Sequence, residues 1–293
     1  MSKPVPARGP LHSVLYIPAS NQRALDKARS LPADAFILDL EDAVAPAMKG
    51  LARRQMQDAL ADGGALSGCT VVVRINGFDT PYAEEDLAAL AAAPRWPDAV
   101  LVPKVSEPSD LERVAAALAA HGAPAEVRLW AMIETPAAIV NLKEIAGSAP
   151  RTGLDCLVVG ANDIAKDMRL RVKPGRATLL PILSTIVVTA RAYGLAVLDA
   201  VYNAIGDSEG FRAECIDGRD WGFDGKTVIH PSQIAIAREA FAPTPDEIAE
   251  AEAIVAAFAR PENAEAGAIS LNGQMVERLH LAIAERVLAS RRD

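Results

Sequence analysis

VRLWAMIE, at residues 127–134, is an apolar run that ends in one charged residue, Glu134. TPAAIVNLKEIAGSA (135–149) follows with apolar residues at helical spacing, and CLVVGAND (156–163) is a second apolar run that ends in Asp163. A short apolar run, an amphipathic segment and another short apolar run are typical of a β–α–β unit with parallel strands. This stretch therefore predicts a chain built from such units.

The same alternation continues on both sides of this stretch. Further runs of the same kind, each followed by an Ala- and Leu-rich segment, are SVLYIP (13–18), AFILDLE (35–41), TVVVRI (70–75), AVLVPKV (99–105), AVLDAV (196–201) and KTVIHP (226–231). Eight strands that alternate with helices predict an α/β protein with a closed (β/α)8 TIM barrel. An open dinucleotide-binding sheet would carry a glycine-rich turn after its first strand, where YIPASNQ stands instead.

The chain continues past the eighth predicted strand. We expect residues 11–243 to form the barrel and residues 244–293 to form a C-terminal helical extension. TPDEIAEAEAIVAAFA (244–259) has the N-terminal residues of a capped helix, RPENAEAGAISLNG (260–273) reads as a polar connector, and QMVERLHLAIAERVLAS predicts a final amphipathic helix. Its apolar residues, which need a covering surface, are Met275, Leu279, Leu281, Ile283, Val287 and Leu288. Because the connector is long, we expect this helix to pack on a neighbouring subunit.

Composition limits the partners of the chain. The formal net charge is −8 over 293 residues. Nucleic acids and anionic membranes call for a basic face, so neither is expected as a partner. Cys69, Cys156 and Cys215 have no paired spacing, which predicts reduced thiols. MSKPVPARGP (1–10) lacks the apolar segment of a secretion signal, and no stretch approaches membrane-spanning length, so we expect a cytoplasmic location.

Charged and polar residues close several of the predicted strands. They are Asp39, Glu41, Asp42, Arg74, Lys104, Glu134, Asn162, Asp163, Asp199 and His230. Barrel enzymes place their catalytic groups at the carboxyl ends of the strands. Charged residues at the end of apolar runs are costly to bury unless they are paired or bind a metal. The set therefore predicts an active site at this end of the barrel.

Glu134 and Asp163 end neighbouring predicted strands, so their carboxylates can converge on one point. Two carboxylates without a nearby His or Cys are hard oxygen ligands, which suit Mg²⁺ or Mn²⁺ better than zinc. The alternative is that Glu134 forms a salt bridge within the barrel and Asp163 only caps the helix that follows it. We favour the metal site because of the other charged strand ends.

Arg74 has two compatible interpretations. Its guanidinium group can bind a substrate carboxylate or alkoxide, or it can form a structural ion pair with Glu41 or Asp42. Lys104 is a candidate for a Schiff-base lysine, a hypothesis that the two-carboxylate metal site makes less favoured. His230 is expected to be structural.

Seven segments resemble the citrate lyase beta subunit family and lie in the order expected for it. They are SVLYIPASN, FILDLEDAVAPAMKGLAR, VVVRIN, VLVPKV, AMIETPAAIVNLKEIA, VVGANDIAKDM and WGFDGKTVIHPSQIAIAREAFAP. The resemblance runs from about residue 11 to residue 259. This family includes malyl-CoA, citramalyl-CoA and citryl-CoA lyases and is related to the metal-dependent pyruvate aldolases.

The resemblance implies a role for each of these positions. Glu134 and Asp163 would bind Mg²⁺, and Arg74 and Glu134 would contact the substrate. The acidic residues of the LDLED segment would hold metal-bound water or orient Arg74; they are Asp39, Glu41 and Asp42. The implied reaction is a reversible Claisen-type cleavage of a 3-hydroxyacyl-CoA to acetyl-CoA and a 2-keto acid, in a homo-trimer or hexamer.

The sequence departs from the family pattern at two places. His12 precedes Ser13 where the family often has arginine, which affects the expected contacts near the thioester or its phosphates. Many members also carry an aspartate, in a C-terminal motif resembling DGKMID, that reaches a neighbouring subunit and protonates the enolate. Here LNGQMVERLH has Glu277 in that place. Glu277 is either this catalytic group or a solvated helix residue.

Two further functions stay open from the sequence. One is a CoA-independent, metal-dependent aldolase that acts on a free hydroxy acid. The other is a non-catalytic or partner-dependent subunit that binds a keto acid and Mg²⁺ but acts only inside an assembly.

Overall fold

Eight parallel strands close into a barrel in the order of the chain, with β8 hydrogen-bonded to β1. The computed structural model describes residues 9–61, 63–66, 68–263 and 265–291. Within it Leu11–Ala240 form one compact unit, and the described residues from Phe241 onward belong to a second. The predicted TIM barrel is confirmed, since each of the eight apolar runs overlaps one of the eight strands.

The strands are short and almost completely buried, as expected for a parallel sheet covered by helices. Their bounds are β1 (Ser13–Pro18), β2 (Ala35–Asp39), β3 (Thr70–Arg74), β4 (Ala99–Val102), β5 (Arg128–Ile133), β6 (Leu154–Val159), β7 (Ala196–Asp199) and β8 (Gly225–Val228). The register pairs Asp39 with Arg74 at the carboxyl ends of β2 and β3. Two predicted site residues are therefore adjacent through strand pairing alone.

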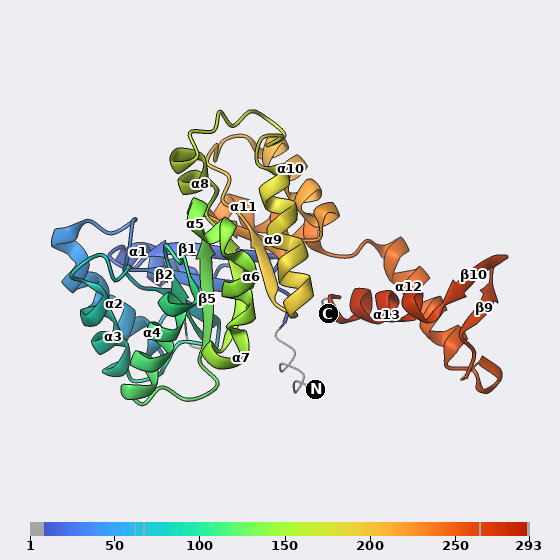
Figure 1. The fold of residues 1–293 in the computed structure, drawn as a ribbon, viewed down its shortest axis with the longest axis horizontal. Coiled ribbons are helices and arrows are strands. Elements are labelled where there is room, and N and C mark those ends of the chain that lie inside the picture. Colours follow the sequence, from blue (N-terminus) through green and yellow to red (C-terminus); the bar gives the residue numbers. More distant parts are fainter. Residues whose placement is uncertain (1–8, 62, 67, 264, 292–293) are drawn as a thin grey trace. The chain divides into compact units, whose positions relative to one another are not determined.

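Helices connect successive strands on the outside of the barrel (Figure 1). Their bounds are α1 (Gln22–Ala28), η1 (Pro46–Met48), α2 (Lys49–Leu60), α3 (Ala83–Ala91), α4 (Pro108–Ala120), α5 (Pro136–Val140), α6 (Leu142–Gly147), α7 (Ala149–Thr152), α8 (Ala161–Asp167), α9 (Leu180–Tyr193), α10 (Ser208–Trp221) and α11 (Pro231–Phe241). Among the described residues, none of the helices is long and apolar enough to cross a membrane.

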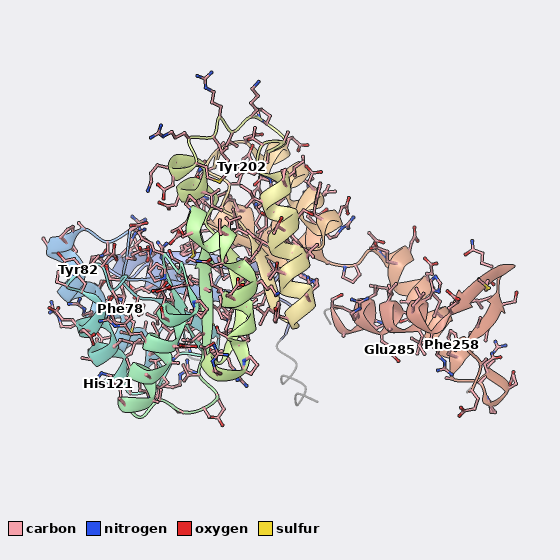
Figure 2. The ribbon with its side chains drawn as sticks, in the orientation of Figure 1. Phe78, Tyr82, His121, Tyr202, Phe258 and Glu285 are labelled. Atoms are coloured by element: carbon pink, nitrogen blue, oxygen red, sulfur yellow. The ribbon has the colours of Figure 1, made fainter. Side chains whose placement is uncertain are left out.

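The C-terminal unit contains two helices and a β-hairpin. Its elements are α12 (Pro245–Phe258), η2 (Pro261–Asn263), β9 (Ala268–Leu271), β10 (Gln274–Glu277) and α13 (Arg278–Ala289), drawn in orange to red in Figure 1. Phe258, labelled in Figure 2, packs with Ile254, Val276 and Ala284 in a small core of this unit.

The hairpin corrects the expected start of the final helix. We expected a connector up to Gly273 and a helix from Gln274, but the helix begins at Arg278. Asn272 and Gly273 have φ angles of 52° and 79°. An Asn-Gly pair with positive φ at both residues favours a two-residue hairpin turn, and Leu271 pairs with Gln274 across it. The residues that follow the turn therefore form a strand.

Candidate active site

The mouth of the barrel is lined by the last inward-facing residues of several strands. Successive side chains of a strand point to opposite faces of the sheet. The core inside the barrel includes Val14, Ile37, Val72, Met132 and Val158. Two residues further along the chain from each of these stand Tyr16, Asp39, Arg74, Glu134 and Gly160. Strand alternation therefore gathers these five positions at one end of the barrel.

A cavity of ≈ 340 Å³ opens among these residues. It is lined by Arg74, Glu134 and Asp163, together with Asp39 and Asp42 from the segment after β2. Predicted residues from four separate parts of the sequence thus come together at one cavity. Its apolar wall comprises Met132, Val159, Val201 and Ile229.

Arg74 is held by two carboxylates. Its Nε and Nη2 atoms donate to Asp39 Oδ1 and Oδ2 at 2.7 and 2.6 Å. Its Nη1 atom lies 3.1 Å from Glu41 Oε2. Burial alone would lower the pKa of Arg74, but Asp39, Tyr16 and Glu41 together raise it well above its ordinary value. The expected structural ion pair exists, with Asp39 as the main partner in place of Asp42.

Glu41 lies behind this pair and is 5% exposed. Lys104 Nζ is 3.3 Å from Glu41 Oε1 and 4.0 Å from Asp42 Oδ2. Burial raises the pKa of Glu41 to about 7, although Arg74 acts to lower it. Burial would lower the pKa of Lys104, but the Glu41 and Glu134 carboxylates raise it. Lys104 therefore keeps its proton, which argues against a Schiff-base lysine.

Glu134 is 1% exposed and reaches the cavity from the end of β5. Its Oε1 atom accepts a hydrogen bond of 2.7 Å from the backbone N–H of Lys104. Lys104 has a positive φ of 52°, which is uncommon outside glycine. Burial raises the pKa of Glu134. A buried carboxylate with one fixed oxygen is well placed to present its other oxygen, Oε2, to a cation.

Gly160 leaves the space that this second oxygen needs. A Cβ atom at position 160 would lie 2.7 Å from Glu134 Oε2 and 2.4 Å from Glu134 Cβ. Any larger residue would therefore displace the Glu134 side chain. The sequence interpretation missed Gly160, although its place at the junction of β6 and α8 was visible as VVGAND.

Asp163 lies in the first turn of α8, whose N-cap is Gly160. Its Oδ1 atom accepts from Lys166 Nζ at 2.8 Å, and its side chain is 26% exposed. In the described part of the chain, no group of three or more His, Cys, Asp or Glu side chains could hold a metal. Glu134 and Asp163 could hold a cation at this cavity, with water and substrate oxygens completing its coordination shell, as is common for Mg²⁺.

A buried polar group fixes the segment that contains Glu41. Lys49 Nζ donates to Leu40 O, Glu41 O and Asn76 Oδ1 at 2.7, 2.8 and 2.7 Å. Asn76 Nδ2 also donates to Asp86 Oδ2 at 2.6 Å. These bonds hold the loop after β2 against the end of β3. The sequence offered no signal for this role, since a lysine at the start of a helix is usually solvated.

Two other strand ends serve the fold. Lys226 is fully buried, with its Nζ atom 2.8 Å from Asp199 Oδ2, and Arg176 Nη1 is 2.7 Å from Asp199 Oδ1. His230 Nδ1 lies 2.8 Å from Ser232 Oγ. The 340 Å³ cavity is not lined by Lys226, Asp199, Arg176 or His230. His230 thus lies outside the cavity, in agreement with the expectation that it is not a catalytic base.

Glu277 belongs to the C-terminal unit. It ends β10 and is the N-cap of α13, where its side chain accepts from the backbone N–H of His280. His280 Nδ1 in turn accepts from the Glu277 N–H at 2.9 Å. Glu277 is thus a capping residue at a strand–helix junction, and not a residue within a helix as the sequence suggested.

Fold and cavity together define a class of protein: (β/α)8-barrel enzymes with an acidic, oxygen-rich site at the carboxyl ends of the strands. Within this class, the chain belongs to the HpcH/HpaI aldolase/citrate lyase family, which it matches over residues 12–231.

Relatives with known names support this assignment. A (3S)-malyl-CoA thioesterase from Cereibacter sphaeroides is 46% identical over 96% of this chain and 94% of its own length. Citrate lyase subunit beta from Leuconostoc mesenteroides subsp. cremoris is 34% identical over 94% of this chain and 91% of its own length. Protein CitE from Mycobacterium tuberculosis, solved in complex with magnesium, acetoacetate and coenzyme A, has a TM-score of 0.77 at 32% identity and covers 97% of this chain and 98% of its own. The metal predicted from the sequence is thus present in a solved relative.

Proposed function

We propose that this chain is a Mg²⁺-dependent lyase that cleaves a 3-hydroxyacyl-CoA of the malyl-CoA type to acetyl-CoA and a 2-keto acid. The observation that carries the proposal is the meeting of Glu134, Asp163 and Arg74 at one cavity. The names of the relatives, and the magnesium and coenzyme A bound in the CitE complex, favour a CoA thioester as the substrate.

Glu134 and Asp163 would hold the ion through Glu134 Oε2 and the Asp163 carboxylate. Bound Mg²⁺ supplies a Lewis acid that lowers the pKa of the substrate hydroxyl group. Arg74 would contact the substrate oxygens that gain negative charge, since a preorganised cation stabilises such charge best where water is excluded. Asp39 and Glu41 would keep the guanidinium group in position. Asp42, whose side chain is 60% exposed, would accept from water near the ion.

Hydrolysis of the thioester is a second candidate. It is favoured by one observation, the name of the relative that is 46% identical along almost the full length of both chains. Hydrolysis of malyl-CoA would release malate and free coenzyme A, whereas carbon–carbon cleavage would release glyoxylate and acetyl-CoA. The two reactions differ in which bond of the same substrate is broken.

The experiment is to incubate the purified chain and Mg²⁺ with (3S)-malyl-CoA, citramalyl-CoA and citryl-CoA, each in a separate assay. Keto acid, acetyl-CoA and free thiol are measured at the same time. Keto acid and acetyl-CoA in equal amounts support the lyase, and free thiol without keto acid supports hydrolysis. Turnover of free malate or citramalate would instead support a CoA-independent aldolase. Binding of Mg²⁺ and keto acid without any turnover would support a partner-dependent subunit.

We also propose that the chain acts as a homo-trimer or hexamer in the cytoplasm. Cys69, Cys156 and Cys215 are free thiols, as a reducing compartment favours. Met275, Leu279 and Ile283 on the C-terminal unit are 71%, 55% and 45% exposed. Several exposed apolar side chains within one small unit favour a partner surface, which we take to be a second copy of this chain.

A further inference from the structure

Tyr16 lines the active-site cavity, and its hydroxyl group bonds to Met132, a second lining residue. It lies on β1 two residues beyond Val14, packs on the core inside the barrel and lines the 340 Å³ cavity with Arg74 and Glu134. Its hydroxyl group donates to Met132 Sδ over 3.4 Å. A thioether sulfur is a weak hydrogen-bond acceptor. A substrate oxygen that enters the cavity would therefore be a better partner for this proton than Met132 is.

Arg74, the positively charged side chain that lines the cavity, is already paired with two carboxylates. Arg74 uses Nε and Nη2 for Asp39, at 2.7 and 2.6 Å, and directs Nη1 toward Glu41 at 3.1 Å. Its Cζ atom also lies 5.0 Å from the centre of the Tyr16 ring. The positive charge of Arg74 is thus shared with two carboxylates. A substrate whose negative charge moves from its hydroxyl oxygen to its thioester oxygen during cleavage would be stabilised by a further donor in the cavity.

Tyr16 can be such a donor without exchanging its proton. Burial raises the pKa of the phenol, although Arg74 acts to lower it. The hydroxyl group stays protonated at neutral pH, so it is neither a base nor a nucleophile. A protonated donor fixed in a buried site stabilises a developing oxyanion without reorganisation.

We propose that Tyr16 is a further catalytic residue, whose hydroxyl group donates a hydrogen bond to the thioester carbonyl oxygen of the acyl-CoA. This inference rests on the proposed function. When the bond between C2 and C3 breaks, its electron pair moves toward the thioester and places negative charge on that oxygen. The 3-hydroxyl group loses its proton and becomes the keto-acid carbonyl, and the α-carbon gains a proton, so the net change is the transfer of one proton. Tyr16 gains and loses none.

The test is Tyr16→Phe, which removes the hydroxyl group and keeps the ring that contacts Arg74. We expect kcat to fall by about a hundredfold, the size of effect for one oxyanion donor, with Mg²⁺ and keto-acid affinity unchanged. The matched control is Tyr193→Phe on α9, outside the cavity, for which kcat should stay within about twofold of wild type. A Tyr16→Phe enzyme with kcat near that of the control would overturn the inference.

A binding measurement separates this inference from the proposed function. Acetyl-CoA has the thioester oxygen, and S-ethyl-CoA, a thioether, lacks it. Tyr16→Phe should lower the affinity for acetyl-CoA several-fold and leave the affinity for S-ethyl-CoA unchanged. An equal loss for both ligands would mean a structural role and overturn the inference. If the wild type binds both CoA ligands but cleaves no hydroxyacyl-CoA, the lyase proposal fails, and the ligand pair still decides whether Tyr16 contacts the oxygen.

Discussion

Arg74 and Asp39 form a two-point ion pair at the adjacent ends of β3 and β2, with N–O distances of 2.7 and 2.6 Å. The same carboxylate accepts from the backbone N–H groups of Glu41 and Ala43 at 2.9 and 3.0 Å. Asp39 therefore fixes the guanidinium group and the following loop together. A planar guanidinium group matches a carboxylate at two points, whereas an ammonium group acts as a single point charge.

Arg74→Lys should consequently lower kcat/KM by about a hundredfold or more, because the planar two-point donor is lost. The protein should stay folded, because the positive charge remains. Steady-state kinetics and circular dichroism measure the two effects. Arg113→Lys is the matched control, since Arg113 is exposed on α4 and pairs with Glu84 at 3.2 Å. A loss for Arg74→Lys no larger than for this control would mean that Arg74 serves only the fold.

Asp163→Asn and Glu134→Gln should each weaken Mg²⁺ binding and remove Mg²⁺-dependent turnover, because each takes a charged oxygen ligand from the cavity. Calorimetric titration with Mg²⁺ measures the affinity without substrate. Asp167→Asn is a close control for the first variant, since both aspartates lie on α8 and contact Lys166, at 2.8 and 3.4 Å. Near-native Mg²⁺ affinity in Asp163→Asn would refute its role as a ligand.

Much of the fold and of the cavity could be predicted from the sequence because both follow from strand alternation. Apolar runs that end in a charge place that charge at the mouth of a parallel barrel, which is how Arg74, Glu134 and Asp163 were found. Tyr16 follows the same alternation in SVLYIP but carries no charge, so nothing marked it.

The errors have local causes. The hairpin around Asn272 was missed because QMVE and the residues after it have helical spacing, while the Asn-Gly turn decides the local structure. The expected ion pair of Arg74 with Glu41 exists, but its pair with Asp39 was missed because Glu41 and Asp42 are as near in the sequence as Asp39. Only the register of β2 against β3 distinguishes them.

Glu41 should make the free energy of unfolding depend on pH. Burial raises its pKa from the ordinary value of 4.5 to about 7. The folded state therefore favours the protonated form of Glu41. The contribution of this carboxyl group to the free energy of unfolding is fully present below pH 4.5 and is lost as the pH rises through 7. Glu41→Gln cannot titrate, so between pH 4.5 and 7 its stability should fall less than that of the wild type in urea denaturation. Glu112→Gln, exposed on α4, is the control. A Glu41→Gln curve parallel to that of the wild type would refute the prediction.

The last prediction concerns the C-terminal unit, in which apolar side chains divide between two faces. Leu281, Val287 and Leu288 pack on the core of the unit itself. Met275 and Leu279 stay 71% and 55% exposed and flank Glu277 in the sequence. Because such a surface needs cover, we expect an oligomer in which this face lies over the active-site mouth of a neighbouring subunit.

Two variants separate assembly from chemistry in that oligomer. Leu279→Asp places a charge on the apolar face, so it should shift sedimentation toward smaller species and reduce turnover with it. Glu277→Gln should leave sedimentation unchanged and slow only the protonation of the α-carbon, measured as exchange of the acetyl-CoA methyl protons in heavy water. Glu285→Gln is the control, since Glu285 is an exposed residue of the same helix, α13 (Figure 2). A wild-type rate of proton exchange in Glu277→Gln would leave Glu277 with its capping role alone. A fully active monomer would refute both the assembly and the role of Glu277 in a neighbouring site, because a single copy would then complete its own site.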